Sequence, residues 1–407
     1  MRVLYVASSR GISAKRPGLG SGRKISGIVA CWRDEGHEVR LVGGRDIDGR
    51  EDTLPSTSGA SNTLPLYRRL SVIQPLLNSY SEWRDLCHDR RLKSYLLQLT
   101  ANWIPDLIWH RSSRLHIAPL RVARSLGIPY ILEWVDSPIR YRYSFFRRLA
   151  LQIEHTRMQQ AFRIIVPSLV IARNLAAREK IRRDKFIIAY NAVDPHKFRR
   201  DQESRERIRR ELGVRESEVL IGYVGGFAWY HNTPILADAA RRLRMYSPEV
   251  NYSTRFLIVG AGQGRRAFEK ALDTYEVRDL FILVGRVLPE AVPSYLSACD
   301  IAVLPGSLDT ICPIKVAEYM AAGLPSVVPD TPANREIVSP GKNGLLFTPG
   351  DAADLVRSLL KLINNTQMRI EMGNSAQTTA ALRLSWQATW GRALEDILSA
   401  LQNRLNA

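Results

Sequence analysis

Short apolar runs alternate along this chain with longer segments in which apolar residues recur every three or four positions. The runs predict buried parallel strands and the longer segments predict helices that cover them, the rhythm of a doubly wound α/β fold. Helical patterns include 25–35 and 117–126, and residues 43–65, rich in Gly, Ser, Thr and Asp, predict a long loop. We expect strands at 2–7, 38–42, 107–110, 130–135, 163–166, 186–189, 220–224, 256–259, 281–284, 301–304 and 326–328.

The chain is long enough for more than one hydrophobic core. Its 407 residues, 45% of them hydrophobic, predict two α/β domains. Its four cysteines show no metal-ligand spacing and are typical of a reducing cytoplasm without disulfides. No apolar run approaches the roughly 18 residues that span a bilayer, and the first strand is too short for a signal sequence. We therefore expect a cytoplasmic protein.

Positive charge is concentrated in the first half of the chain. The net charge is +18, and residues 1–200 hold 35 Lys and Arg against 17 Asp and Glu, so the remainder is balanced. Such a field attracts polyanions or an anionic membrane leaflet. Segments 66–77 and 139–149 mix arginines with aromatic or aliphatic residues, which favours peripheral membrane contact. The plainer interpretation is a partly packed helix with a basic outer face.

Residues 311–330 hold the most informative motif. A strand leads into a loop, Pro313 suits the start of a helix, Lys315 and Glu318 share one helix face, and Gly323 ends the helix. A helix N-terminus at the carboxyl end of a parallel strand favours phosphate. A carboxylate one turn further along can accept hydrogen bonds from a ribose diol. The motif therefore predicts binding of a nucleoside diphosphate.

This motif resembles the donor site of family 4 glycosyltransferases, which have the GT-B fold of two Rossmann-like, doubly wound domains facing across a cleft. The resemblance implies an acceptor-side domain at 1–197, a donor domain at 198–382, and a helix at 383–407 that crosses back to the first domain. It also implies transfer of a sugar from a UDP- or GDP-sugar with retention, without a metal or other cofactor. Five further segments match the family in the right order, at 190–198, 222–232, 256–262, 284–300 and 343–347.

The resemblance assigns roles on the donor side. Glu318 would bind the ribose, and Lys315 would neutralise the leaving diphosphate, with His231 as the second choice. In the plainer interpretation Glu318 stabilises an early helix turn, Lys315 is solvated and His231 is a polar loop residue. The remaining expected donor-binding residues are Gly226, Gly260, Gly262, Arg286, Val287, Thr310, Ile311, Cys312 and Pro313.

The acceptor side carries weaker signals. The triplet Gly20, Ser21 and Gly22, followed by Arg23, resembles the first-domain glycine turn and would suit an anionic acceptor. Asp136 either orients or deprotonates the acceptor hydroxyl, or caps the following segment. An Asp-x-Asp string at 46–48 lies in the wrong domain for a metal site, so we expect no metal.

The chain departs from the family pattern at several positions. Thr310 replaces a Glu, Gly226 and His231 replace an Arg and a Lys, and Val135 replaces a His. Alternatives are therefore a degenerate partner subunit, an epimerase of the same fold, a nucleic-acid binder or a transferase acting on a soluble acceptor. We favour a lipid-linked glycan acceptor in surface-polysaccharide assembly, with no nucleic-acid partner.

Overall fold

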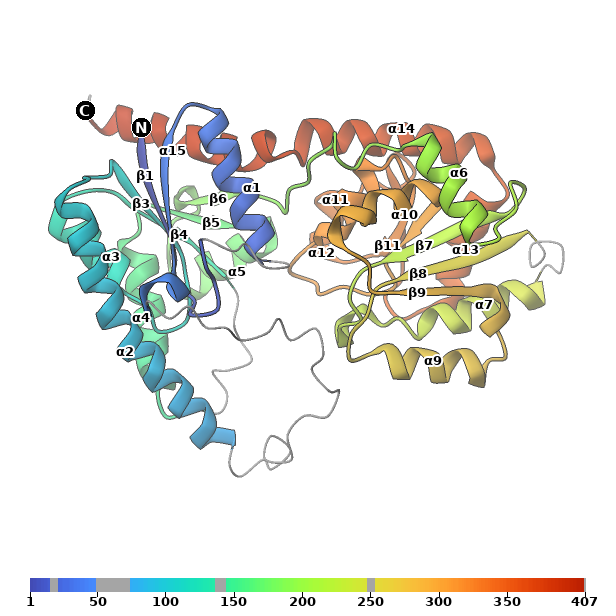
Figure 1. Cartoon of the computed structure of the whole chain (residues 1–407), viewed down its shortest axis with the longest axis horizontal. Helices are drawn as coiled ribbons and strands as arrows, with labels where there is room; N and C mark the ends of the chain where they lie inside the picture. The colour runs from blue at the N-terminus through green and yellow to red at the C-terminus, as the bar shows by residue number, and fades with distance from the viewer. Residues whose placement is uncertain (15–20, 49–73, 136–143, 247–252, 406–407) are drawn as a thin grey trace. The chain divides into compact units, whose positions relative to one another are not determined.

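The computed structural model describes residues 1–14, 21–48, 74–135, 144–246 and 253–405. These form two compact units (Figure 1): unit 1 comprises 1–166, 172–189 and 390–407, and unit 2 comprises 167–171 and 190–389. Gly20, Asp136 and most of the two arginine-rich segments lie outside the described residues. Among the described residues, none of the helices has the length and apolar character needed to cross a membrane.

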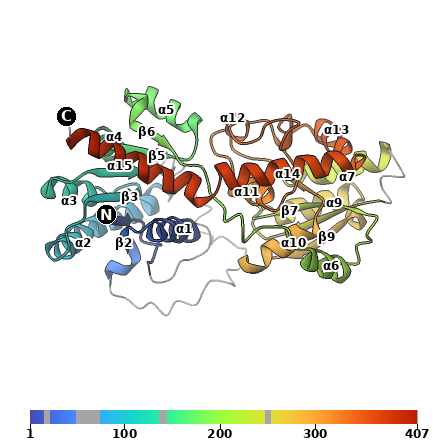
Figure 2. The same cartoon turned by 90° about the horizontal axis from the view of Figure 1, so that it is seen from above.

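The chain passes from unit 1 to unit 2 at residue 190 and returns at residue 390. The expected domain boundaries were residues 198 and 383. Val193 bridges to Ser385, so both ends of the crossover remain with unit 2. Trp390 belongs to unit 1, where its carbonyl accepts a hydrogen bond of 2.9 Å from Trp32 Nε1 and its ring lies 6.2 Å from that of Trp109. This packing returns the final helix, α15 (Arg392–Leu405), to unit 1 (Figure 2).

Unit 1 is built on a six-stranded parallel sheet of order β2-β1-β3-β4-β5-β6. Strand β1 is buried on both faces from Val3 to Ala7, which explains its continuous apolar run. The strands are β1 (Arg2–Ala7), β2 (Glu38–Gly43), β3 (Leu107–Arg111), β4 (Tyr130–Glu133), β5 (Arg163–Val166) and β6 (Phe186–Ile188). The helices are α1 (Ser21–Asp34), α2 (Gln74–Ala101), α3 (Ala118–Leu126), α4 (Arg147–Gln160) and α5 (Leu169–Glu179).

Unit 2 contains a second six-stranded parallel sheet, of order β12-β11-β10-β7-β8-β9. Residues 343–347, which match the family but are not among the expected strands, include the edge strand β12. The strands are β7 (Val219–Val224), β8 (Thr254–Val259), β9 (Phe281–Gly285), β10 (Ile301–Val303), β11 (Ser326–Pro329) and β12 (Gly344–Phe347). The helices are α6 (Gln202–Glu211), α7 (Ile235–Tyr246), α9 (Arg265–Thr274), α10 (Val292–Ala298), α11 (Ile314–Ala321), α12 (Pro332–Arg335), α13 (Ala352–Ile363) and α14 (Thr366–Arg383).

The strand order of unit 2 determines where a ligand can bind. The chain lays β8 and β9 on one side of β7 and then crosses to β10 on the other side. Ligands of such sheets bind at the carboxyl ends of the strands, beside this reversal. The loop after β7 begins at Gly225, and the loop after β10 leads into α11. The predicted phosphate-binding helix therefore follows the strand at the reversal.

Candidate functional site

Lys315 lies in the first turn of α11. Pro313 caps this helix with φ −65° and ψ 147°, an extended conformation from which the chain enters the helix. The Lys315 Nζ atom lies 2.8 Å from His231 Nε2, and His231 Nδ1 lies 3.2 Å from the carbonyl oxygen of Gly306. A carbonyl can only accept, so Nδ1 carries the proton and Nε2 accepts from the Lys315 ammonium. The two residues, 84 positions apart, form one chain of hydrogen bonds.

The surroundings of Lys315 and His231 lower the pKa of both side chains. Burial lowers the pKa of Lys315 to about 8, against the attraction of the Glu318 carboxylate. Burial, and then the charge of Lys315, lowers the pKa of His231 to about 4, although the hydrogen bond to Gly306 opposes this shift. At neutral pH the histidine is therefore uncharged and the lysine is charged. His231 is only 4% exposed, and its Nε2 atom contacts the Lys315 ammonium.

One glycine loop packs against Lys315, and a second glycine loop packs against the first. Gly225 has φ 157°, and a Cβ atom there would overlap the Cε of Lys315. Gly260, after β8, has φ 144°, and a Cβ there would overlap the carbonyl of Gly225. Both positions therefore require glycine for the close approach as well as for the backbone conformation. The family-like glycines thus form the wall beside the lysine stem.

The loop that leads into α11 is fixed through its backbone. Ser168 Oγ donates to the carbonyl of Thr310 at 2.6 Å, and Asn191 Nδ2 donates to the carbonyl of Cys312 at 3.0 Å. Cys312 is 4% exposed, and burial raises the pKa of its thiol. The Cys312 side chain is therefore an inert packing group, and its predicted donor contact can involve only the backbone. Ile311 and the other expected residues of the loop are partly exposed.

The other predicted donor residues lie at the same edge of the unit 2 sheet. Glu318 is half-buried one turn beyond Lys315. Gly226 and Gly262 are exposed in the loops after β7 and β8, and Arg286 and Val287 follow β9. The structure thus brings these residues to the carboxyl ends of neighbouring strands.

The acceptor-side prediction is only partly covered by the described residues. Gly22 and Arg23 lie in the first turn of α1, where Gly22 is buried and Arg23 is half-buried. Gly20, the side chain of Ser21 and Asp136 lie outside the described part. The expected strand at 130–135 ends earlier in the structure, because Glu133 is the last residue of β4.

Glu133 is the centre of a buried polar cluster in unit 1 that the sequence analysis missed. Tyr5 Oη donates to its Oε2 at 2.6 Å, and Trp109 Nε1 donates to the same oxygen at 3.1 Å. Arg111 pairs with Oε1, and Lys24 Nζ of α1 lies 3.7 Å from that oxygen. Burial alone would raise the pKa of Glu133, but the two cations and two hydrogen bonds outweigh it and lower that pKa. The carboxylate therefore ties α1 to three strands.

Lys24 is one of the residues that surround Glu133. Its ammonium lies 4.4 Å from the centre of the Trp390 ring, and burial lowers its pKa to about 8 against the attraction of Glu133. An anionic acceptor would therefore meet Arg23 rather than Lys24.

The described residues contain no group of three or more His, Cys, Asp or Glu side chains able to hold a metal ion. Asp46, from the Asp-x-Asp string, accepts hydrogen bonds from Ser13 Oγ at 2.5 Å, the amide of Ala14 at 2.6 Å and the amide of Gly43 at 3.1 Å. These contacts give Asp46 a structural role in its loop.

Comparison with known proteins decides the family. Residues 204–379 match the family model described as glycosyl transferases group 1, and residues 20–192 match a glycosyl transferase 4-like domain. Together the two matches follow the two units of the structure. The chain is a group 1 glycosyltransferase. It is thus a nucleotide-sugar-dependent enzyme with the two-domain GT-B fold.

Curated relatives of this glycosyltransferase act on different molecules, according to their names. The α-D-kanosaminyltransferase of Streptomyces kanamyceticus is 23% identical over 66% of this chain and 70% of the relative. The 2-deoxystreptamine glucosyltransferase of the same organism is 25% identical over 74% of this chain and 78% of the relative. The sulfoquinovosyl transferase of Arabidopsis thaliana is 25% identical over 76% of this chain and 59% of the relative.

Solved structures share the fold of this glycosyltransferase over nearly its whole length. HepE of Anabaena, crystallised with UDP, superposes with a TM-score of 0.71 at 17% identity, covering 98% of this chain and 100% of HepE. Sucrose-phosphate synthase of Thermosynechococcus elongatus gives a TM-score of 0.72 at 16% identity, with the same coverage.

Proposed function

We propose that this glycosyltransferase moves a sugar from a UDP- or GDP-sugar to a hydroxyl of a carbohydrate acceptor, with retention at the anomeric carbon. The observation that carries the proposal is the Lys315–His231 pair at the start of α11, with Glu318 one turn further along. Support also comes from HepE, whose crystal structures contain UDP, UDP with glucose, and UDP-glucose.

The proposed mechanism gives each donor-side residue one task. The Lys315 ammonium and the amides that begin α11 stabilise the diphosphate as the bond from the anomeric carbon to its oxygen breaks. His231, neutral at pH 7, accepts from Lys315 and holds it in place. Glu318 accepts hydrogen bonds from the ribose hydroxyls. The acceptor hydroxyl attacks the face that the diphosphate leaves, and a diphosphate oxygen takes its proton.

We propose that the segment after β9 selects the nucleotide base. Arg286 is exposed and Val287 is half-buried, so the backbone of these residues can read the edge of the base. A backbone site accepts either uracil or guanine, according to the local conformation. A thermal-shift panel of UDP- and GDP-sugars identifies the base.

Donor affinity is expected to fall as the pH rises above about 8, because the pKa of the Lys315 ammonium in the free protein is about 8. Below that pH the lysine is already charged, so affinity is constant. Above it, binding must be accompanied by uptake of a proton, and affinity decreases by up to about tenfold per pH unit. Calorimetry of an intact nucleotide sugar between pH 6.5 and 9.5 measures this slope.

The control is Lys315→Arg, since a guanidinium stays charged throughout this range. Its affinity for the donor is expected to be weaker but independent of pH. If the unmodified enzyme also showed a flat profile, Lys315 would not contact the diphosphate.

The acceptor that we propose is a lipid-linked glycan in surface-polysaccharide assembly, reached by peripheral contact of unit 1 with an anionic membrane. The large apolar side chains exposed on this unit include Leu76, Tyr80 and Trp83 on α2, and Phe145 before α4, at 59%, 60%, 53% and 72%. The amide of Phe145 bonds to Ser79 at 3.1 Å, which joins the two segments into one patch. Aromatic side chains of this kind suit the depth of lipid headgroups.

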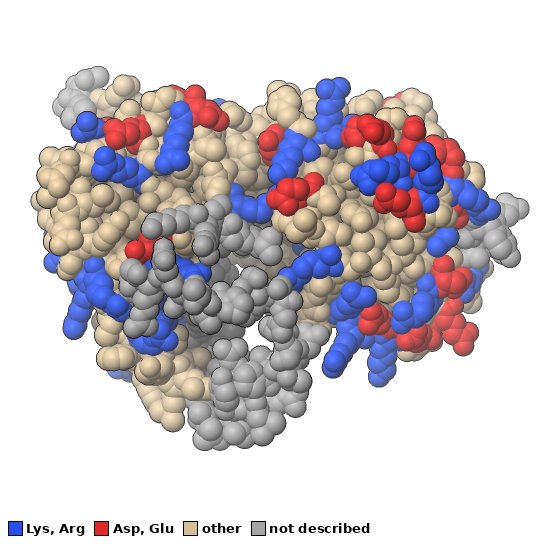
Figure 3. All heavy atoms as spheres, viewed as in Figure 1, with Lys and Arg blue, Asp and Glu red and all other residues tan. Residues whose placement is uncertain are grey.

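The charge distribution supports the same acceptor. On the face shown in Figure 3, acidic side chains are interspersed with basic ones over unit 2, whereas fewer acidic side chains lie over unit 1. This agrees with the sequence, in which the excess of positive charge lies within residues 1–200. A basic surface beside an apolar patch favours anionic lipids.

A soluble acceptor is the second candidate, and the relatives favour it. Two of them are named an α-D-kanosaminyltransferase and a 2-deoxystreptamine glucosyltransferase. In that case the exposed apolar patch would serve a purpose other than membrane contact.

The test combines transfer and membrane binding. Donor turnover is measured with a lipid-diphosphate-linked glycan and with soluble glycosides, the anomeric configuration of the product is read by NMR, and sedimentation with phosphatidylglycerol vesicles measures membrane binding. We expect acceptor-dependent turnover with retention, and binding that is lost in the double variant Trp83→Ser, Phe145→Ser but kept in Leu382→Ser, an exposed residue of unit 2. Full activity on a soluble acceptor without vesicle binding would refute the lipid-linked acceptor, and inversion would refute the mechanism.

A further inference from the structure

A cavity lies at the amino ends of the unit 2 strands, opposite the end that carries the predicted donor residues. Its volume is about 460 Å³, and its walls include Val219 at the start of β7, Asp300 just before β10, and Pro325 just before β11. These are the amino ends of strands whose carboxyl ends lead to the donor residues. The cavity is therefore remote from Lys315 and α11's first turn within the same unit.

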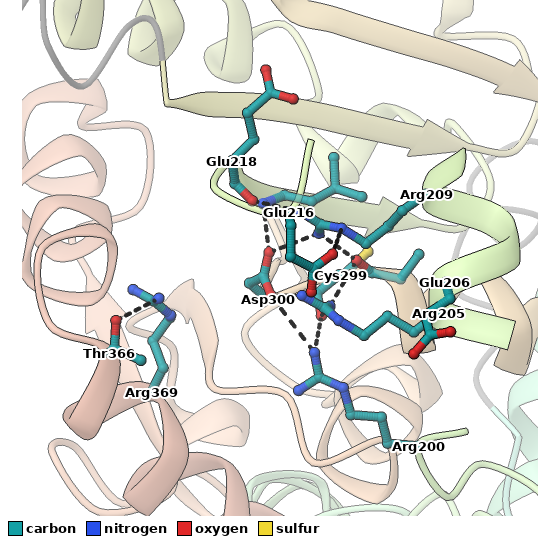
Figure 4. Close-up of polar contacts among 12 residues, drawn as sticks. Arg200, Arg205, Glu206, Arg209, Glu216, Glu218, Cys299, Asp300, Thr366 and Arg369 are labelled. Carbon is teal, nitrogen blue, oxygen red and sulfur yellow. Dashed lines mark hydrogen bonds and ion pairs between the residues drawn. The ribbon is translucent and has the colours of Figure 1, made fainter. Parts of the chain in front are cut away.

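Three arginines converge on Asp300 beside this cavity (Figure 4). Arg205 Nη2 lies 2.8 Å from Asp300 Oδ1, and Arg209 Nη1 lies 3.1 Å from Oδ2. Arg200 Nη2 lies 3.6 Å from Oδ1. Asp300 also accepts the amide of Leu220 at 2.8 Å. One carboxylate thus faces three guanidinium groups, which leaves an excess of two positive charges.

The nearby acids do not remove this excess. Glu218 pairs instead with Arg215 at 3.4 Å. Glu216 is the acid nearest to Arg209, at 4.0 Å from its Nε, but the Glu216 side chain is 79% exposed to water. Arg209 itself is 2% exposed, and its Nε makes no hydrogen bond. A buried cationic nitrogen of this arginine cluster therefore lacks a hydrogen-bond acceptor.

Arg369, on α14, brings a further cation to the wall. It donates to the carbonyls of Leu362 and Ile363 and to Thr366 Oγ1, but within the described part of the chain it pairs with no carboxylate. Burial lowers the pKa of Arg369; the attraction of Asp300 opposes this shift and the charge of Arg205 adds to it. Burial and then the charge of Arg205 lower the pKa of Arg200 as well. An anion would relieve the repulsion at both residues.

The arginines divide into two functional pairs. Arg205 and Arg209 attach α6 to the sheet, since they also donate to the carbonyls of Ala298 and Cys299 and, for Arg209, of two further residues. Arg200, with 37% of its side chain exposed, and Arg369 lie at the wall with donors still accessible. Arg200 also donates to the Cys299 carbonyl at 3.0 Å, and Arg369 donates to carbonyls at the end of α13, so these two residues keep only part of their donors for a ligand.

We propose that this cavity binds the phosphate group of a small phosphorylated molecule, held by Arg200 and Arg369. A phosphate monoester carries a charge of about −1.5 to −2 at pH 7, which matches the excess. Guanidinium groups donate in pairs to phosphate oxygens, and the volume falls in the usual range of small-molecule sites. The site is separate from the donor residues, so phosphate and nucleotide can occupy unit 2 together.

The test uses the full chain, with inorganic phosphate and glycerol 3-phosphate as soluble probes and phosphatidic acid vesicles as the lipid-bound form. Binding of each is measured by calorimetry or sedimentation in the unmodified chain and in the double variant Arg200→Gln, Arg369→Gln. We expect the double variant to bind the phosphate roughly 10- to 100-fold more weakly. The soluble and vesicle arms show which form of phosphate the cavity accepts.

Two control variants make the outcome decisive. Arg207→Gln, an exposed residue of α6 paired with Glu211, should leave phosphate binding unchanged. Lys315→Met should also leave it unchanged, because that residue lies at the other end of the sheet. If Lys315→Met abolished phosphate binding and the double variant retained it, the anion would occupy the start of α11 and the proposal would be wrong. Equal binding by the double variant and the unmodified chain would also refute it. Because these readouts need no sugar transfer, they are independent of the proposed function.

Discussion

Replacement of Lys315 by methionine is expected to lower kcat by roughly 10²- to 10³-fold, the usual cost of removing one preorganised group that stabilises transition-state charge. Methionine keeps the apolar stem that packs beside Gly225 and removes only the ammonium. The loss should therefore appear as a chemical defect in a folded enzyme. Release of the nucleoside diphosphate in the presence of acceptor measures it.

The matched control is Lys270→Met, an exposed lysine of α9 in the same unit, which should change kcat by less than about twofold. Circular dichroism and thermal unfolding of both variants exclude a folding defect. A Lys315→Met enzyme with the kcat of the unmodified chain would mean that the leaving group is stabilised elsewhere, and the role assigned to α11 would fail.

Replacement of Glu133 by glutamine is expected to lower the free energy of unfolding of unit 1 by about 3–5 kcal/mol, as is typical when one partner of a buried ion pair is removed. Glutamine can still accept from Tyr5 and Trp109. The ammonium of Lys24 and the guanidinium of Arg111, however, would remain buried without a carboxylate. Urea unfolding followed through tryptophan fluorescence, including that of the buried Trp109, reports the transition.

Glu38→Gln is the control for that measurement. Glu38 is half-exposed and lies 3.2 Å from Arg2, so its replacement should cost at most about 1 kcal/mol. If Glu133→Gln were as mild as the control, water would be compensating the two cations, and the cluster would not attach α1 to the sheet.

The sequence predicted the strands of both sheets well, because strands depend on local signals. The apolar run predicts β1, and Pro313 and Gly323 predict where α11 begins and ends. Each of these signals lies in a few neighbouring residues. The glycines after β7 and β8 were identified through their family resemblance. In the structure Gly225 packs against Lys315, and Gly260 packs against Gly225.

The contacts that determine the chemistry were not predictable in the same way. His231 reaches Lys315 across 84 residues, and Glu133 collects partners from two other strands and from α1. Such contacts depend on strand order and register, which no local pattern encodes. The end of β4 at Glu133, two residues before the expected end of that strand, was likewise not predicted. The arginines around Asp300 form no motif in the sequence, and only the fold brings them to one carboxylate.

The most direct test of the central claim is the equilibrium binding of UDP- and GDP-sugars to the unmodified chain and to Glu318→Gln at pH 7. We predict saturable binding of one nucleotide type, weakened roughly 10- to 100-fold in Glu318→Gln, which loses charged hydrogen bonds to the ribose. Glu371→Gln, an exposed residue of α14, should bind as the unmodified chain does. Equal affinity of Glu318→Gln and the unmodified chain would contradict the placement of the donor on α11.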